Sequence, residues 1–574
     1  MAYSDVYKSW LASGALTDDQ IKELADIEND DKEIESRFYG SLEFGTAGLR
    51  GIMGMGTARM NVYVIRQATQ AFAETILEDP DSAGKSVAIC YDCRINSETF
   101  AREAASVMAG NGISVRIFEA MRPTPELSFA IRHYGCAAGL NVTASHNPKE
   151  YNGYKVYWSD GAQLPPAKAA VIAAKMEKTD MFTGIKKIPY EDGLKSGMIT
   201  LMGAETDEAF LENVMAQAND FETVAKVSDS FNMVYTPFHG TGYQLVPEAL
   251  RRLGIKNIHC VEEQMVIDGN FPTVVSPNPE NPEGFYLAVE LAEKTGSDFI
   301  LGTDPDTDRV GIMVRGHDGK FVTISGNQTG VLLLDYVIGA KKRAGTMPLN
   351  PVALKTIVTT EMARKVAEEN GVSCYNTFTG FKFMAEKKNS LEERGEGKVI
   401  FSYEESYGYM LGDFVRDKDA VTASLLLTEM AAWYASRGMT LYDALMSMYE
   451  KYGWYSEKTL SFVLPGLDGA EKIRQIMAGL RADPPKTIGG TAVALRREYS
   501  DGTELDVKTG TVSKMELSDS NVVSYVLEDG TTVIVRPSGT EPKVKVYILA
   551  AGKSEAECRE KIMEYTKWAE ALKD

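Results

Sequence analysis

The sequence predicts an α/β protein with three topologically similar α/β domains and a smaller α+β C-terminal domain around a central cleft. Apolar, strand-like runs alternate with amphipathic helical stretches over most of the chain, a pattern typical of largely parallel sheets with helical crossovers. The alternation falls into three successive groups, each of which ends in a polar loop. The C-terminal part differs, because paired strand-like runs there precede a single helical stretch.

The N-terminal segment predicts a helical extension without recognisable chemistry. Thr17 occupies the N-cap position before DDQIKELADIE, in which Ile21, Leu24 and Ile27 recur at helical spacing and are expected to be buried. We predict these domains: 1–220 (extension and first α/β domain), 221–325, 326–455 and 456–574.

In the C-terminal domain, TTVIVRPSGTEPKVKVYILAAG predicts two strands joined by a polar loop, and residues 501–530 predict hairpins and loops. Residues 452–467 are interpreted as the connection into this domain. Ser554 and Glu557 have the spacing of a capping box for the final helix.

Composition excludes several classes of partner. The chain has 574 residues, 44% of them hydrophobic, and a net charge of −20, which argues against nucleic acid and anionic membranes as partners. No run approaches the ~20 apolar residues that span a bilayer, and the N-terminus does not resemble a secretory signal, so we expect a cytoplasmic protein. Cys90 and Cys93 form a lone CxxC, interpreted as two small residues at a strand end rather than a metal or redox pair.

A turn after the run CAAGLNVTA carries a candidate nucleophile. In TASHNP, residues 143–148, the Asn-Pro pair predicts a turn that presents Ser145 and His146 where α/β folds bind ligands. A serine hydroxyl needs activation or prior phosphorylation, and Lys155 follows closely enough to reach the same pocket. Taken alone, the turn is equally compatible with an incidental Ser and His, and no GxSxG motif favours a hydrolase.

The sequence DPDTDR, residues 304–309, follows the apolar run DFILGT and carries candidate metal ligands. Asp304, Asp306 and Asp308 repel one another unless a cation or hydrogen-bond donors lie among them, and an all-oxygen ligand set suits a hard cation such as Mg²⁺. An EF-hand is excluded, because Arg309 and Arg315 stand where that motif has glycine and glutamate. Arg309 suits a phosphate clamp. The alternative is a solvated acidic loop.

Further loops offer sugar and phosphate contacts. YEESYG, residues 403–408, provides Glu404 and Ser406 for hydroxyl groups, and TGFK precedes it. RDKD, residues 416–419, is interpreted in isolation as a solvated charge run. In RPSGTEPK, residues 536–543, an arginine, hydroxyls and a glycine can converge on one anion, although an ordinary hairpin turn has the same composition.

Taken in this order, the four loops closely resemble those of the α-D-phosphohexomutase family, which includes phosphoglucomutases and phosphomannomutases. FGTAGLRG (44–51), YDCR (91–94), YTPFHGTG (235–242) and SPNPENPEG (276–284) fit as well, so the resemblance covers nearly the whole chain beyond the extension. The long N-terminus with LEFGTAGLRG is most similar to the branch of bacterial phosphoglucomutases and eukaryotic phosphopentomutases.

The resemblance implies roles for individual residues. Ser145 matches the serine that carries the phosphate, and it binds the metal together with Asp304, Asp306 and Asp308. The implied catalytic residues are Ser145, His146, Lys155 (a general acid/base candidate), Arg50 and Lys418. The implied substrate-binding residues are Arg309, Thr379, Gly380, Glu404, Ser406, Arg536, Ser538, Gly539 and Thr540, with Glu404 and Ser406 on the sugar hydroxyls and the loop from Arg536 on the non-reacting phosphate.

The expected reaction is an isomerase-class phosphoryl transfer between glucose 1-phosphate and glucose 6-phosphate. It would use Mg²⁺, a phosphoserine enzyme and glucose 1,6-bisphosphate as intermediate and activator, with sugar phosphates as the partners of a monomer or dimer. Mannose or pentose phosphates are alternative substrates, and a free bisphosphate is an alternative product.

Two departures and two rival interpretations accompany the resemblance. The metal loop has Pro305 and Thr307 as spacers where the family commonly has glycine or alanine, and no histidine follows Glu404-x-Ser406 as in some phosphomannomutase-like members. DPDTD also resembles the DxDxT of haloacid-dehalogenase-type phosphatases, which leaves TASHNP and RPSGTEP unexplained. A non-catalytic sugar-phosphate-binding protein is the remaining rival.

Overall fold

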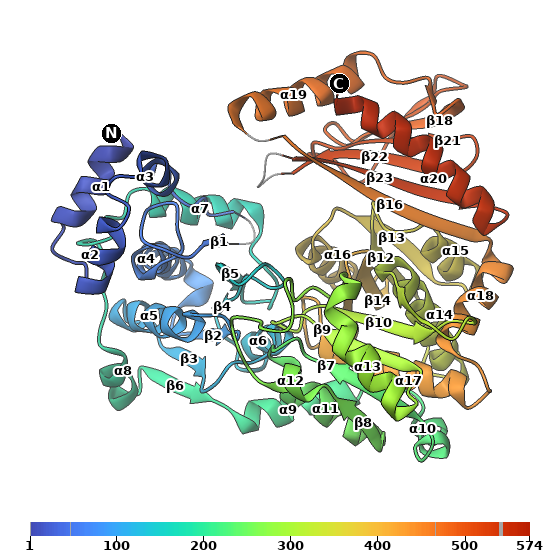
Figure 1. Ribbon diagram of the computed structural model, residues 1–574, viewed down its shortest axis with the longest axis horizontal. Helices are drawn as coiled ribbons and strands as arrows, with labels where there is room; N and C mark the ends of the chain where they lie inside the picture. The colour runs from blue at the N-terminus through green and yellow to red at the C-terminus, as the bar shows by residue number, and fades with distance from the viewer. Residues whose placement is uncertain (1, 46–47, 465, 539–542, 574) are drawn as a thin grey trace. The chain divides into compact units, whose positions relative to one another are not determined.

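The structure, a computed structural model, describes residues 2–45, 48–464, 466–538 and 543–573 (Figure 1). It separates into two compact units. The first unit comprises Met1–Ser325 and Ser406–Thr440, and the second comprises Gly326–Glu405 and Leu441–Asp574.

The first sheet of the first unit has the strand order β1-β5-β4-β2-β3-β6. The strands β2, β3, β4 and β6 run parallel, and β5 adds antiparallel to β4 and β1 to β5. Their bounds are β1 Leu49–Ile52, β2 Val87–Tyr91, β3 Val115–Phe118, β4 Ala138–Val142, β5 Tyr151–Trp158 and β6 Ile199–Met202.

Helices cover both faces of this sheet, which explains why β2 is apolar throughout. Val87, Ile89 and Tyr91 pack with α4 (Val62–Glu78) and α5 (Ser97–Gly110), whereas Ala88 and Cys90 pack with α6 (Thr124–His133) on the other face. Peripheral helices are α7 Pro166–Met176, α8 Tyr190–Ser196, α9 Ala204–Met215 and the 3₁₀ turn η1 Pro80–Ser82.

The second sheet of the first unit has the order β11-β10-β9-β7-β8, with β7 parallel to β8 and β9 and with β10 and β11 added antiparallel. Phe285 and Ala288 pack against one face of it. The bounds are β7 Asn232–Thr236, β8 Asn257–Cys260, β9 Phe299–Thr303, β10 Val310–Arg315, β11 Phe321–Ile324, α10 Phe221–Val227, α11 Gly242–Leu253, α12 Glu262–Met265, η2 Pro282–Phe285 and α13 Tyr286–Thr295. The segment Ser406–Thr440 of this unit contains α17 Ala420–Ala435 and the short strand β15 Gly408–Met410, which is not part of this sheet.

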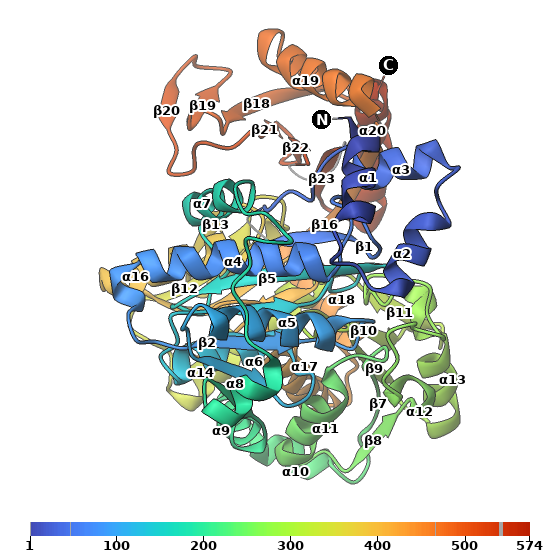
Figure 2. The same ribbon diagram turned by 90° about the vertical axis from the view of Figure 1, so that its left-hand side faces the viewer.

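The N-terminal extension folds as α1 Tyr3–Ala12, α2 Asp18–Ala25 and α3 Asp31–Phe38 (Figure 2). The predicted cap at Thr17 is confirmed, because its side chain and that of Gln20 form a reciprocal capping box. Leu24 is buried and Ile27 is half-buried as expected, but Ile21 is 41% exposed, so the prediction that it is buried is wrong. Trp10 is the centre of the small core, with Phe38, Tyr63 and Phe182 against its ring edge-on.

In the second unit, β12 (Pro351–Thr356) lies between the parallel strands β13 (Ser373–Thr377) and β14 (Lys398–Glu404). Its helices are α14 Gly326–Ala344, α15 Met362–Glu369, α16 Phe381–Glu393 and α18 Leu441–Tyr452. The antiparallel C-terminal sheet has the order β16-β23-β22-β21-β18-β19-β20, and β17 pairs with β18.

The bounds in the C-terminal part are β16 Trp454–Val463, α19 Gly466–Ala482, β17 Thr487–Ile488, β18 Thr491–Glu498, β19 Thr503–Asp506, β20 Val512–Lys514, β21 Val523–Leu527, β22 Thr532–Pro537, β23 Lys543–Gly552, α20 Glu555–Glu570 and η3 Ala571–Lys573. The hairpins predicted between residues 501 and 530 are therefore confirmed.

Two local predictions for this part are wrong. Residues 452–467 are not merely a connection, because β16 pairs with β23 along its whole length. Ser554 accepts a hydrogen bond from the Glu557 N–H, but the Glu557 carboxylate accepts from the Lys553 N–H, so the capping box is only half formed.

The cysteines, all within the described residues, are free thiols, and Cys90 on β2 packs in a hydrophobic cluster. Among the described residues, no helix combines the length and the apolar character needed to cross a bilayer.

Candidate active site

The candidate nucleophile lies in the loop between β4 and β5. The backbone of Ser145 adopts a positive φ of 51°, an uncommon conformation for a residue with a side chain. The two strands are antiparallel, and Asn141 on β4 is directly opposite Lys155 on β5. Gly153 has no room for a side chain, since a Cβ there would lie 2.4 Å from the Thr143 carbonyl oxygen. The strand register thus brings Lys155 to the same aspartate loop that Ser145 contacts.

The three aspartates converge because residues 304–309 form a tight loop between antiparallel strands. Thr303 on β9 is paired with Val310 on β10, and Thr307 has a positive φ of 55°. Asp304, Asp306 and Asp308 are each at most 1% exposed, and one carboxylate oxygen from each lies within 4.8 Å of the others. The alternative of a solvated acidic loop is therefore wrong.

The segment HGTG, residues 239–242, packs against the aspartate loop and forms hydrogen bonds with it. A Cβ at Gly240 would lie 2.4 Å from the Pro305 Cα, and one at Gly242 would lie 3.1 Å from the Thr307 hydroxyl. Thr241 donates its N–H to the Pro305 carbonyl at 2.8 Å and contacts the Thr307 hydroxyl at 2.8 Å. The spacers Pro305 and Thr307 are thus the residues through which the loop is held.

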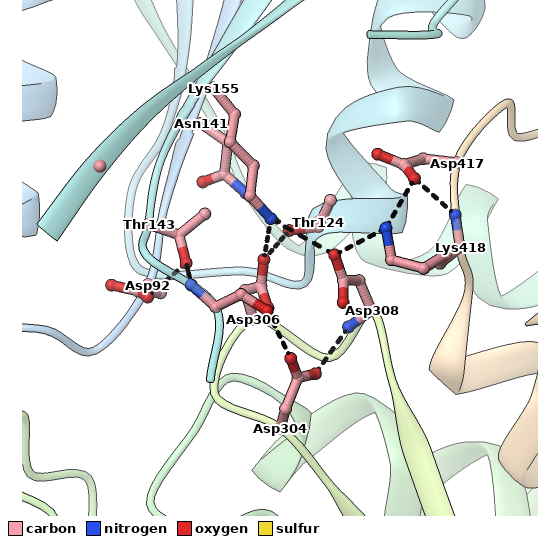
Figure 3. Close-up of polar contacts among 12 residues, drawn as sticks. Asp92, Thr124, Asn141, Thr143, Lys155, Asp304, Asp306, Asp308, Asp417 and Lys418 are labelled. Atoms are coloured by element: carbon pink, nitrogen blue, oxygen red, sulfur yellow. Dashed lines mark hydrogen bonds and ion pairs between the residues drawn. The ribbon is translucent and has the colours of Figure 1, made fainter. Parts of the chain in front are cut away.

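Ser145 and two lysines contact the carboxylates, and Figure 3 shows Lys155 and Lys418 beside the aspartates. Ser145 Oγ donates to Asp304 Oδ2 at 2.7 Å. Lys155 Nζ donates to Asp306 Oδ2 at 2.7 Å and to Asp308 Oδ2 at 3.3 Å. Lys418 Nζ lies 3.2 Å from Asp308 Oδ2 and 3.2 Å from Asp417 Oδ1. Nucleophile, acid/base candidate and aspartates therefore form one connected cluster.

The RDKD segment is buried, so its interpretation as a solvated charge run is wrong. Arg416, Asp417, Lys418 and Asp419 are each at most 8% exposed. Asp417 accepts hydrogen bonds from the Tyr157 hydroxyl at 2.9 Å and the Gln163 amide at 3.0 Å, while Asp419 caps α17. Hydrogen bonds or ion pairs to these side chains make the burial possible.

The balance of burial and neighbouring charges raises the pKa values of Asp304 and Lys155 and lowers that of His146. Burial and the neighbouring charges of Asp306 and Asp308 raise the pKa of Asp304 well above its usual range. Burial acts against the charged form of Lys155, but Asp306 and Asp308 outweigh it and raise the pKa of Lys155. Burial, together with the charges of Arg309 and Arg50, lowers the pKa of His146 well below its usual range, which favours the neutral ring.

The donor set fits a divalent metal ion. Asp306 Oδ1 and Asp308 Oδ1 are buried without a hydrogen-bond partner among the described residues, and such buried oxygens normally have a partner. All the candidate ligands are hard oxygen donors, which suits a cation of the Mg²⁺ type.

Several residues of the cluster were not predicted from the sequence. Thr124 donates its hydroxyl to Asp306 Oδ2 at 2.7 Å and its N–H to the Asp306 carbonyl at 2.8 Å, and Asn141 donates to the Thr124 hydroxyl at 2.7 Å. Asp92 accepts from the Thr143 hydroxyl at 2.6 Å. The one available indication was that a polar YDCR directly follows an apolar strand.

The first unit also holds the predicted residues His146, Arg50, Arg309 and Ser406. His146 Nδ1 is 3.2 Å from Ser145 Oγ, and Arg50 donates to the Asn147 side chain at 3.2 Å. Arg309 pairs with Glu280 at 3.2 Å. Ser406 belongs to the returning segment of this unit.

The second unit holds the other predicted substrate contacts. The Gly380 N–H donates to Glu404 Oε1 at 2.6 Å, and the Thr379 hydroxyl is buried without a hydrogen-bond partner among the described residues. At the β22–β23 hairpin, the Ser538 N–H donates to the Lys543 carbonyl at 2.8 Å, and Arg536 Nε is buried without such a partner in the described part of the chain. Gly539 and Thr540 lie outside the described residues.

Comparison with known proteins decides the family. Models of the phosphoglucomutase/phosphomannomutase family match the chain as α/β/α domain I at residues 41–182, domain II at 208–319, domain III at 325–452 and the C-terminal domain at 490–564. The chain belongs to the α-D-phosphohexomutase family. This phosphohexomutase is therefore a mutase of the isomerase class, and the predicted fold class is confirmed.

Relatives and solved structures agree with this phosphohexomutase assignment. A protein named phosphoglucomutase from Staphylococcus saprophyticus is 33% identical over 94% of this chain and 95% of the relative, and one from a bovine strain of Staphylococcus aureus is 36% identical over 90% and 91%. A putative phosphomannomutase from Thermus thermophilus has the same fold, with a TM-score of 0.67, 22% identity and coverage of 92% and 99%. The phosphoglucomutase parafusin from Paramecium likewise gives a TM-score of 0.67 at 19% identity over 92% and 94%.

Proposed function

We propose that this phosphohexomutase interconverts glucose 1-phosphate and glucose 6-phosphate through a phosphorylated Ser145. The observation that carries the proposal is the contact of 2.7 Å between Ser145 Oγ and Asp304, within a buried group of aspartates that Lys155 also contacts. The choice of glucose is supported by the relatives at 33% and 36% identity, which are named phosphoglucomutases.

Asp304, Asp306, Asp308 and the serine oxygen would hold Mg²⁺. When bound, the ion would neutralise charge on the transferring phosphoryl group. Arg309, adjacent to the aspartates, would contribute a guanidinium to the same oxygens.

The chain's own residues would then move one proton and one phosphoryl group. Without a metal ion, Asp306 and Asp308 raise the pKa of Lys155; Mg²⁺ on these aspartates would offset their charge and favour the neutral amine. Neutral Lys155 would accept the proton of the sugar hydroxyl as the hydroxyl oxygen bonds to the phosphorus of phosphoserine. The bond from phosphorus to Ser145 Oγ breaks, and the serine oxygen leaves with its electron pair. The reverse transfer from the other end of glucose 1,6-bisphosphate restores phosphoserine and releases the isomeric monophosphate.

The sugar must bind in two orientations, so the residues that contact it must accept either of its phosphorylated ends. We assign the sugar hydroxyls to Glu404 and Ser406, with Thr379 and Gly380 beside Glu404 as a further contact. The non-reacting phosphate is assigned to Arg536, Ser538, Gly539 and Thr540. The Nε of Arg536 has no hydrogen-bond partner among the described residues, which supports this role, since a buried guanidinium nitrogen needs an acceptor.

The decisive experiment is a coupled assay of glucose 1-phosphate conversion with Mg²⁺ and trace glucose 1,6-bisphosphate. Ser145→Ala is expected to abolish turnover, and Ser9→Ala, at an exposed hydroxyl in α1, is the matched control. Activity only with mannose 1-phosphate or ribose 1-phosphate would change the substrate. Accumulation of free bisphosphate would indicate a synthase, and absence of turnover with every sugar would favour a binding protein.

A further inference from the structure

The turn that carries Ser145 is bound by one guanidinium from a different part of the domain. Arg94 Nη2 donates to the Ser145 carbonyl at 2.6 Å and to the Asn147 carbonyl. Arg94 Nη1 donates to the carbonyls of Pro148 at 2.9 Å and Tyr151 at 3.0 Å. A single side chain, only 3% exposed, thereby ties the nucleophile to the start of β5.

The same network holds the other side of the Ser145 peptide. Arg94 Nε lies 3.3 Å from Asp92 Oδ2, and that oxygen accepts a hydrogen bond from the Thr143 hydroxyl at 2.6 Å. The Thr143 hydroxyl in turn accepts from the Ser145 N–H at 2.9 Å. Both backbone polar groups of Ser145 are therefore fixed by buried side chains, at the residue whose φ is 51°.

Residues 269–271, in the second α/β domain of the first unit, pack against Arg94 and the adjacent Cys93. The Phe271 ring centroid lies 5.1 Å from the Arg94 guanidinium carbon, within the range of a cation–π contact. A Cβ at Gly269 would lie 2.7 Å from the Cys93 carbonyl oxygen, so only glycine allows this approach. Arg94 is therefore enclosed between the serine turn and residues 269–271.

We propose that Arg94 is a positioning residue that aims Ser145 Oγ for phosphoryl transfer by holding the turn in its left-handed conformation. The inference rests on the proposed function, in which the reaction occurs at Ser145. A non-glycine residue at positive φ persists only where its surroundings determine it, and transfer rates depend steeply on the alignment of the reacting atoms. Lysine cannot replace this role, because one ammonium group lacks the planar fork that serves several carbonyls at once.

The test compares Arg94→Lys with Arg66→Lys. Arg66 also forms a two-point pair, with Glu103 at 2.7 Å and 2.8 Å, but away from the serine turn. The first measurement is the single-turnover rate at which glucose 1,6-bisphosphate phosphorylates Ser145, followed by intact mass. Arg94→Lys is expected to slow this step on the order of 100-fold, whereas Arg66→Lys leaves it unchanged.

Amide hydrogen exchange over residues 145–151 provides a second measurement that needs no turnover. We expect faster exchange there in Arg94→Lys and in Thr143→Val, the variant to use if Arg94→Lys does not fold, and wild-type exchange in Arg66→Lys. If wild type is not phosphorylated, the proposed function fails. Amide exchange would still test whether Arg94 holds the serine turn. Wild-type exchange in both turn variants, or faster exchange with an unchanged transfer rate, would overturn the inference.

Discussion

Replacement of Gly240 by alanine tests whether packing beneath the aspartate loop controls metal binding. The added Cβ would lie 2.4 Å from the Pro305 Cα, 2.7 Å from the Pro305 carbonyl oxygen and 2.9 Å from that of Pro237. Carbon atoms in contact are normally about 3.5–4.0 Å apart, so the loop must shift by roughly 1 Å. Because all of these atoms are backbone, no side-chain rotation can relieve the clash.

The expected cost follows from that displacement. Overpacking of this kind costs about 1–3 kcal/mol of stability. Pro305 separates Asp304 from Asp306, and ligand distances tolerate only about 0.2 Å, so we expect Mn²⁺ affinity to fall about 10- to 100-fold. Isothermal titration with Mn²⁺ measures the affinity, and urea unfolding measures the stability.

Alanine variants of two other glycines serve as comparisons for Gly240→Ala. A Cβ at Gly242 would meet the hydroxyl oxygens of Tyr235 and Thr303 rather than backbone, so Gly242→Ala is expected to lose less affinity. Gly479 in α19 has open space around its Cβ position, and Gly479→Ala is expected to be neutral or to stabilise by up to about 1 kcal/mol. Wild-type Mn²⁺ affinity in a folded Gly240→Ala variant would refute the reasoning, as would an equal loss in Gly242→Ala.

Three further predictions address separate parts of the chain. Thr124→Val removes the hydroxyl that contacts Asp306 and leaves the buried Asn141 amide without its acceptor, so Mn²⁺ affinity should fall about tenfold; Thr75→Val, whose hydroxyl bonds only to its own helix at Ala71, should leave it unchanged in the same titration. Burial raises the pKa of Glu457 from 4.5 to about 7, so the folded state binds this proton more tightly and the free energy of unfolding should fall as pH rises from about 4.5 to 7. Glu457→Gln should therefore gain about 1–3 kcal/mol over wild type at pH 8 and much less at pH 4.5 in urea unfolding, and an equal gain at both would contradict this. Trp10→Ala should destabilise the N-terminal helices by about 3–5 kcal/mol, seen as early proteolysis of residues 3–38; unchanged resistance would show that the side chain, 1% exposed, is not the centre of that core.

The resemblance of the loops to those of the family was sufficient to predict that the serine and aspartate loops share one site. Both follow apolar strands, and alternate carboxylates in a short loop have few stable arrangements without a cation or donors among them. It was not sufficient for the residues that hold those loops. Thr124 and Asn141 are ordinary turn and strand residues in sequence. Only the folded first unit brings Thr124 to Asp306 and Asn141 to Thr124.

Charge and local pattern led to wrong predictions for two segments. RDKD has the composition of a solvated segment, but Lys418 is buried between Asp308 and Asp417, and neither partner can be inferred from spacing along the chain. Residues 454–463 lack a clear apolar alternation, and their partner strand β23 begins only at Lys543. Pairing across such sequence distances is set by tertiary structure rather than by local propensity.

The chain order of the two units has a consequence for biosynthesis. The first unit needs Ser406–Thr440, which supplies Lys418 to Asp308, the Ala420 N–H to the Thr307 carbonyl at 3.2 Å and the Glu429 carboxylate to the Asn219 N–H at 2.8 Å. A ribosome must therefore translate Gly326–Glu405, which belongs to the second unit, before the first can finish folding. Until then Asp308 lacks its contact with Lys418, and α10 and α11 lack their packing against α17. Truncation between residues 325 and 440 therefore yields an aggregation-prone fragment rather than a free-standing serine and aspartate module.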